Sequence, residues 1–407
     1  MTMLPFLREN ARWLAAGALL SFLSSFGQTF FIALFAGELR DEFALSLGQW
    51  GGIYAVGTAT SAAIMVFSGT LADKIRIRTL GLVIISGLAL SCFAMAFNPS
   101  GAALVLVILA LRFTGQGMLT HLSVVAMARW FTANRGKALA VATLGFSFSE
   151  AILPIPVVWL KSFVDWHLIW IGAGFFCLAM LPIVWVLLRL ERSPKSIADE
   201  SAVPGMDNHH WTRLQAIRQP LFWSISLGVM LFSAIGTSFW FHQVHFAEVK
   251  GWTHLSLVAV FPLGTVAFSL SVIGYGLAID RFGADKLLPV YLLPLTVAFL
   301  LHALAPDVSW TALGVILMGI AGGGQATLPA ACWALFFGTR NIGSIKAVVV
   351  AIMVLGSALG PFITGALIDF GIGFEAQLTA FGVLFAGVCV LIGVTVKHAR
   401  TRLPTTT

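Results

Sequence analysis

The chain is dominated by long apolar runs that alternate with short polar turns. We count twelve runs of about 18–25 residues, each long enough to cross the ~30 Å hydrocarbon layer of a membrane as a helix. The runs lie near residues 13–36, 46–68, 79–97, 102–127, 137–160, 167–188, 220–246, 255–279, 286–304, 309–334, 346–369 and 377–396. Lipid offers the backbone no hydrogen-bond partners, so helices are the expected way to span it. The pattern predicts an all-α integral membrane protein with twelve transmembrane helices.

Composition excludes a soluble globular domain. Of the 407 residues, 58% are hydrophobic and 10% are charged, whereas soluble domains carry about 25% charged residues. The first apolar run lacks a small-residue cleavage site, and we expect it to be a retained span rather than a removed signal peptide. The four cysteines fall in four different runs without metal-ligand spacing, so we expect buried thiols and neither a cofactor nor a metal.

The distribution of cations predicts the orientation. With the N-terminus inside, the inner segments hold twenty Lys and Arg residues, and the outer loops hold only Arg40, Lys161 and Lys250. Cytoplasmic loops carry this excess, so both termini are expected in the cytoplasm. The net charge of +7 then reflects membrane topology, and the thin spread of cations gives no nucleic-acid patch. We expect a multi-pass protein of a cell membrane, most simply a bacterial inner membrane, and a monomer.

A short charged hinge occurs twice. The first copy, GTLADKIRIR, spans Gly69–Arg78 and joins the second and third runs. The second, GLAIDRFGADK, spans Gly276–Lys286. Gly276, Asp280 and Arg281 repeat Gly69, Asp73 and Lys74 at one constant spacing of 207 residues. The duplication predicts two similar halves.

Further pairs support the repeat. Gly115 and Gln116 correspond to Gly324 and Gln325, and the aromatic and basic residues of the inner loop WFTANRGKA recur in FFGTRNIGS. We therefore expect two pseudo-symmetric six-helix bundles, residues 1–188 and 220–407. Residues 189–219 contain Pro, Gly, Ser and mixed charge, which favours a cytoplasmic linker.

The hinge resembles the loop signature G-x-L-x-D-R/K-x-G-R/K-R/K of the major facilitator superfamily. Arg76 departs from it where the family has glycine, and the second copy keeps that glycine as Gly283. The resemblance implies that the loops gate transport, with Gly69, Asp73, Lys74, Arg78, Gly276, Asp280 and Arg281 as the gating residues. The paired inner loops also resemble the monocarboxylate and oxalate/formate branch, which has an aromatic, a basic residue and glycine there.

The fourth run carries the most unusual residue, Arg112. A charge at mid-span costs about 2.5–3.5 kcal/mol on insertion scales. Gln116 follows four residues later on the same helical face, and the string R-x-x-G-Q-G is similar to the superfamily motif R-x-x-Q-G-x-G. Glu150 lies at similar depth in the next run. We expect the two charges to pair or to share a water-filled cavity, and a purely structural ion pair is the alternative.

Other polar residues complete the candidate pathway. Gln28 lies near the middle of the first run, and Gln325 occupies the tenth, where Ala321 stands at the repeat position of Arg112. His242 and His245 are three residues apart on one helical face, which suits proton or substrate contact or packing at the membrane interface. The resemblance places helices 1, 4, 7 and 10 around a central solute cavity. It therefore implies that Gln28, Arg112, Gln116, His242 and Gln325 lie beside that cavity.

These features predict a secondary active transporter. It would move a small solute, such as a monocarboxylate, by alternating access with proton coupling, and it would not be an enzyme. The alternative is an efflux permease for a toxic compound, a drug or a metalloid such as an arsenical. The anion carriers of the resembled branch place cations in helix 8 or helix 11, but here helix 8 has none and Lys346 lies at the edge of helix 11. A membrane enzyme or a passive sensor is a further, weaker alternative.

The orientation yields a direct test. Topology reporters fused after residues 75, 200 and 400 should all give a cytoplasmic signal, because these sites lie in cation-rich segments. A reporter after Lys250 is the control and should read external. An external signal at any of the first three positions would contradict the twelve-helix topology.

Overall fold

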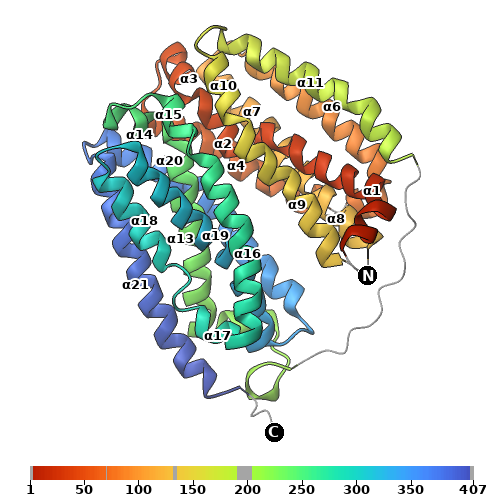
Figure 1. Ribbon diagram of the computed structural model, residues 1–407, viewed down its shortest axis with the longest axis vertical. Helices are drawn as coiled ribbons and strands as arrows, with labels where there is room; N and C mark the ends of the chain where they lie inside the picture. Colours follow the sequence, from red (N-terminus) through yellow and green to blue (C-terminus); the bar gives the residue numbers. More distant parts are fainter. Residues whose placement is uncertain (1–2, 70, 132–134, 190–203, 404–407) are drawn as a thin grey trace. The chain divides into compact units, whose positions relative to one another are not determined.

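The computed structural model describes residues 3–69, 71–131, 135–189 and 204–403. Within these ranges every regular element is a helix, as Figure 1 shows. Ten helices are long and apolar enough to cross a membrane, or eleven if one bent pair is counted as a single span. The all-α membrane architecture is thus confirmed, and the expected count of twelve continuous spans is not fully met.

The chain divides into two compact units. One contains Met1–Ala198 with Trp240–Val244, and the other contains Asp199–Phe239 with His245–Thr407. The helices of the first unit are α1 (Met3–Leu23), η1 (Ser24–Gly27), α2 (Thr29–Ile32), η2 (Ala33–Phe35), α3 (Ala36–Phe43), α4 (Leu47–Ser68), α5 (Leu71–Lys74), α6 (Ile77–Ala96), α7 (Gly101–Leu111), η3 (Arg112–Leu119), α8 (Thr120–Trp130), α9 (Arg135–Ile152), α10 (Pro154–Leu160) and α11 (Trp166–Leu187).

The regular elements described in the second unit are also helices. Its elements are η4 (Met206–Asn208), α12 (Arg213–Ile217), α13 (Pro220–Phe241), α14 (Gln243–Lys250), α15 (His254–Val258), α16 (Phe261–Phe282), α17 (Ala284–Leu287), α18 (Leu293–Leu304), α19 (Val308–Phe337), α20 (Ile342–Asp369) and α21 (Phe374–Arg400). The last residues of α13 and the start of α14 group with the first unit.

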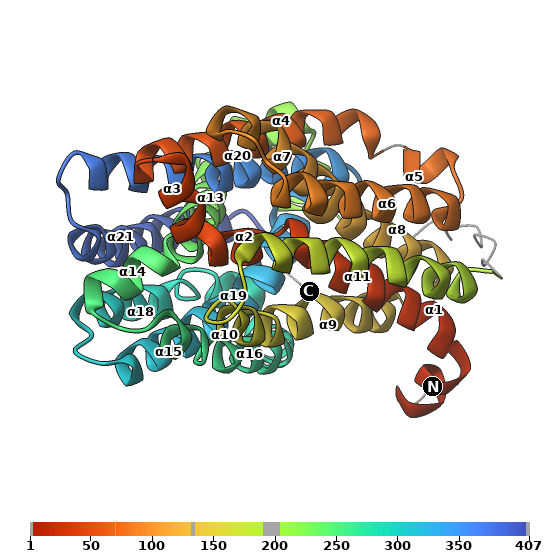
Figure 2. The ribbon, with the colours of Figure 1, turned by 90° about the horizontal axis from the view of Figure 1, so that it is seen from above.

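The first apolar run is bent rather than straight. Its two parts, Phe6–Gly27 and Thr29–Phe43, meet at an angle of 42°. Gln28 lies between them with an extended backbone, φ −86° and ψ 153°, which interrupts the helical hydrogen bonds. Figure 2 shows α1 continuing into α2 and α3 through this break. The break places non-helical backbone inside a membrane span, which is tolerated where protein surrounds it.

The ninth run also departs from a continuous span. Residues 288–292 form turns, and the helix α18 that follows has only 12 residues. Pro289 lies in these turns and Pro294 in the first turn of α18. Proline lacks a backbone N–H and clashes with the preceding turn, so the run is divided although its composition stays apolar.

The expected linker has an ordered C-terminal part. Residues 190–203 lie outside the described ranges, but α12 and the residues before it pack on the second unit. The Trp211 N–H donates to the Phe337 carbonyl at 3.2 Å, and Arg402 pairs with Asp207 at 2.5 Å. The Arg402 guanidinium holds the pKa of the Asp207 carboxyl below its usual value by hydrogen bonding. The boundaries at 188 and 220 remain predictions.

Small residues allow close helix contacts in the first unit. A Cβ added at Gly145 in α9 would lie 1.9 Å from the Ala18 carbonyl oxygen of α1. A Cβ on Gly27 would lie 2.8 Å from the Cα of Gly115, where the first span meets η3. Close backbone approach of this kind is a main source of helix association in lipid.

The Gly145 contact can be tested by adding one methyl group. Gly145→Ala should lower the thermal stability of the purified protein, because overpacking against a backbone carbonyl costs about 1–3 kcal/mol. Gly172→Ala is the matched control, since a Cβ at Gly172 in α11 meets nothing within 4 Å. Equal melting temperatures for the two variants would show that α1 and α9 do not approach this closely.

Candidate functional site

Arg112 is buried inside the first unit. Its side chain is 1% exposed and stands where α7 passes into η3, in the middle of a helical stretch from Gly101 to Trp130. Because a charge at this depth is costly, its surroundings must supply hydrogen bonds. The local structure of two spans provides them.

Two residues of the first span accept from the Arg112 guanidinium. Nη1 donates to the Gly27 carbonyl at 3.2 Å and to Thr29 Oγ1 at 3.3 Å. The guanidinium carbon lies 5.3 Å from the ring centre of Tyr54, which allows a cation–π contact. Among the described residues, the buried Nε has no hydrogen-bond partner. Both hydrogen bonds are at the long end of the normal range, so Arg112 retains unused donor capacity.

Irregular backbone on both sides explains this arrangement. The first span breaks at Gln28, so the carbonyl of Gly27 can accept from a side chain rather than from the next helical turn. On the other side, residues 112–119 form the π-helix η3, which widens the fourth span. π-Helical turns within α-helices are frequent at functional sites. A broken span facing a π-helical turn at mid-span is therefore the best candidate for a solute site.

Thr29 and Tyr54 are site residues that the sequence analysis missed. Their hydroxyl oxygens are 2.5 Å apart, and Tyr54 is fully buried in α4. The contact links the first and second spans beside Arg112. Tyrosine is rare in this chain, with three in 407 residues, and Tyr54 precedes the other two by more than half the sequence. A lone tyrosine in a helix rich in small residues was the available signal.

Glu150 does not pair with Arg112. Glu150 is half-buried in α9, and among the described residues no ion pair joins the two side chains. The neighbouring Ser149 instead contacts the Ser25 hydroxyl of η1. The pairing expected from equal depth is thus wrong for this structure, because Arg112 turns toward the break in the first span. Sharing of a water-filled cavity remains a prediction.

The three predicted glutamines lie in different settings. Gln28 is half-buried at the break of the first span, and Gln116 is half-buried in η3. Gln325 lies in α19 of the second unit, where its Oε1 accepts from the Tyr291 hydroxyl at 2.9 Å. Tyr291 is fully buried, so this bond fixes Gln325 within its own unit.

The two predicted histidines do not share one continuous helix. α13 ends at Phe241 and α14 begins at Gln243, so His242 lies at the interruption. His242 is buried and groups with the first unit, whereas His245 groups with the second. His245 Nδ1 lies 3.7 Å from Glu248 Oε2. The common face inferred from three-residue spacing and a role for either residue stay predictions.

The two hinges adopt different structures. Gly69 ends α4, and its carbonyl lies 3.0 Å from His121 Nε2, while Arg129 Nη1 donates to the Ala72 carbonyl at 2.6 Å. The side chains of Asp73 and Lys74 lie outside the described part of the chain, and Arg78 is half-buried in α6.

The second hinge is helical over most of its length. Gly276, Asp280 and Arg281 all lie inside α16, and the turn comes later, at Gly283 with φ +88°. Asp280 and Arg281 are exposed. The acid that forms an ion pair here is Asp285, at 2.5 Å from Arg400. The gating role of both hinges remains a prediction.

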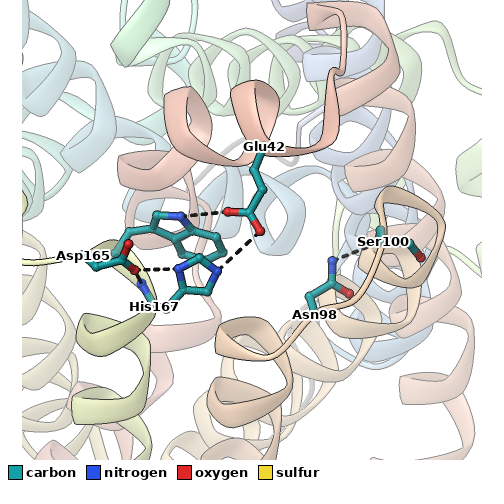
Figure 3. Close-up of polar contacts among 6 residues, drawn as sticks. Glu42, Asn98, Ser100, Asp165 and His167 are labelled. Carbon is teal, nitrogen blue, oxygen red and sulfur yellow. Dashed lines mark hydrogen bonds and ion pairs between the residues drawn. The ribbon is translucent and has the colours of Figure 1, made fainter.

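A polar cluster at the start of α11 joins Glu42 of α3 to Asp165 and His167 (Figure 3). His167 Nδ1 lies 2.6 Å from Asp165, its Nε2 lies 3.4 Å from Glu42, and Trp166 Nε1 donates to Glu42 at 3.2 Å. Hydrogen bonds from the His167 backbone and ring lower the pKa of the Asp165 carboxyl. Within the described ranges, no three His, Cys, Asp or Glu side chains are placed to hold a metal ion.

Comparison with known proteins places this geometry in a family. The family model described as Major Facilitator Superfamily matches residues 17–276. A gallate transporter of Pseudomonas putida is 23% identical over 398 residues, which covers 90% of this chain and 87% of that protein.

Solved structures agree at the level of the fold. The crystal structure of a bacterial homolog to the human lysosomal transporter Spinster, inward-facing and unoccupied, has a TM-score of 0.75 at 17% identity, covering 98% of this chain and 99% of that chain. The nucleoside transporter NupG gives 0.67 at 15% identity, covering 95% and 99%. The matched model spans well over half of the sequence, and the chain therefore belongs to the Major Facilitator Superfamily of membrane transporters.

Proposed function

We propose that the protein is a secondary active transporter of a small organic anion, with a carboxylate group bound by Arg112. The observation that carries the proposal is the unused donor capacity of a buried guanidinium at a broken span. Its two long hydrogen bonds go to neutral oxygens, and a carboxylate is a stronger acceptor that binds a guanidinium by two parallel bonds. Anion binding would replace weak partners with strong ones.

The surroundings of Arg112 favour an aromatic or otherwise planar acid. The Tyr54 ring lies against the guanidinium and its hydroxyl contacts that of Thr29, so a flat aromatic surface and two hydroxyl groups lie beside Arg112. The gallate transporter that this chain resembles suggests a hydroxybenzoate as the first substrate to try. This choice also agrees with the monocarboxylate-like branch inferred from the inner loops.

Proton coupling is assigned to Glu150. This carboxyl lies in a span without an ion-pair partner among the described residues, so its charged form is unfavourable unless a counter-charge or water reaches it. An anion that neutralises Arg112 removes a positive field at Glu150 and favours the protonated carboxyl, which would link proton uptake to anion binding. We further propose a monomer in a bacterial inner membrane with both termini cytoplasmic and with the two hinges as gates.

The substrate class can be tested by competition. Purified protein in vesicles should take up labelled gallate when an inward proton gradient is imposed, and unlabelled gallate should compete. The neutral analogue 3,4,5-trihydroxybenzamide should compete at least about tenfold less well, because it loses a charge-assisted hydrogen bond worth roughly 1.5–3 kcal/mol. Equal competition by the amide would contradict carboxylate recognition. Outward transport of an arsenical or a drug instead would favour the efflux alternative.

The roles of Arg112 and Glu150 are separated by neutral substitutions. Arg112→Gln should abolish gallate binding, and Arg112→Lys should restore little of it, since a point charge does not reproduce a planar two-pronged donor. Glu150→Gln should retain gallate exchange but lose acceleration by the proton gradient. The measurement is transport per folded molecule, with Arg213→Gln as a control that neutralises an exposed cation. Near-normal transport by the Arg112→Gln, Glu150→Gln double variant would refute the site.

A further inference from the structure

An apolar groove runs along the first unit beside the break in the first span. It has a volume of about 460 Å³ and is lined by the first span, α10 and α11. Phe22, Phe26 and Phe31 form one wall, and Gly172 and Ala173 of α11 form part of another. All of its lining residues are apolar and belong to the same unit.

Local sequence explains why helices do not fill this space. α9 ends at Ile152, and the chain restarts as α10 with Pro154 in its first turn, followed by Pro156. Gly172 leaves open space on α11, since a Cβ added there meets nothing within 4 Å. A proline-interrupted helix opposite a glycine therefore leaves a channel between two spans.

The chemistry of the lining selects the occupant. The groove lies at the level of the spans and offers no polar side chain, so water gains no hydrogen bonds there. Empty space of this size would forfeit dispersion contacts along its walls. Its volume is that of a small-molecule site, and the bilayer surrounds it with flexible hydrocarbon chains. A lipid chain fills such a space without losing solvation.

A lysine next to the groove in sequence is already engaged. Lys161 follows the lining residue Leu160, but its Nζ lies 2.6 Å from Glu38 Oε1 and also donates to the Leu34 carbonyl. A phosphate headgroup would have to displace Glu38 to reach this ammonium group. Recognition is therefore expected to reside in the acyl chain rather than in the headgroup.

We propose that this groove binds one acyl chain of a membrane phospholipid. Phe26 and Phe31 lie on either side of the Gly27–Gln28 break, so a bound chain packs against both arms of the bent span. Arg112 holds the same break through the Gly27 carbonyl. The lipid chain and the arginine thus stabilise one bent conformation by packing and by hydrogen bonding, respectively.

Photolabelling tests the proposal. The full chain is placed in vesicles with a phosphatidylcholine or a phosphatidylglycerol that carries a diazirine in the middle of one acyl chain. After irradiation, peptides covering residues 153–164 and 168–176 should be labelled more strongly than those covering the lipid-exposed face of α16. Both probes should give this pattern. Uniform labelling of all exposed spans, or labelling by the anionic probe alone, would overturn the proposal.

Filling the groove provides the matched variant. Gly172→Phe should abolish the excess labelling of the α10 peptide, whereas Gly274→Phe on α16, where an added Cβ also meets nothing within 4 Å, should leave it unchanged. If Gly172→Phe does not fold, Gly172→Leu serves the same purpose with a smaller side chain. Persistent labelling in a folded Gly172 variant would show that no chain occupies the groove.

Discussion

The hydrogen bond from Arg112 to the Gly27 carbonyl is the interaction on which the candidate site depends. A charge in a span needs acceptors, and a carbonyl freed by a helix break needs a donor. Each irregularity would be costly alone, and together they satisfy one another at 3.2 Å. The match is incomplete, because the Nε of Arg112 has no hydrogen-bond partner in the part of the chain that the structure describes. An incompletely satisfied buried charge is a position that a ligand can complete.

The two halves share a sequence repeat but differ in what the repeat holds. Gln116 and Gln325 are equivalent by spacing, yet Gln116 lies in a π-helix beside Arg112, whereas Gln325 lies in a regular helix and accepts from Tyr291. The equivalent of Arg112 is Ala321, which is fully buried. Without a charge to accommodate, the tenth helix has no need of the irregular backbone found in the fourth. This difference in backbone between the fourth and tenth helices thus coincides with one residue, Arg112 against Ala321.

Much of the fold could be predicted from the sequence because membrane spans follow from length and hydropathy alone. The family followed from the duplicated hinge around Gly69 and Gly276. Features that depend on local backbone geometry could not be predicted from the sequence. Gln28 gives no sign of an extended conformation, and the apolar composition of the ninth run does not show that it is divided at Pro289 and Pro294. Hydropathy counts residues, whereas continuity of a helix depends on individual hydrogen bonds.

The site was harder to predict because side-chain direction decides it. Equal depth suggested that Arg112 and Glu150 pair, but depth fixes only the position along a span. The guanidinium points to Gly27 and Thr29, and the two hydroxyls of Thr29 and Tyr54 meet beside it. The three-residue spacing of His242 and His245 likewise gives no sign that the helix is interrupted at His242. Helical periodicity predicts a shared face only where the helix is continuous. In this chain the helix breaks lie beside buried polar residues, because the polar side chains and the backbone groups freed by the breaks hydrogen-bond with one another.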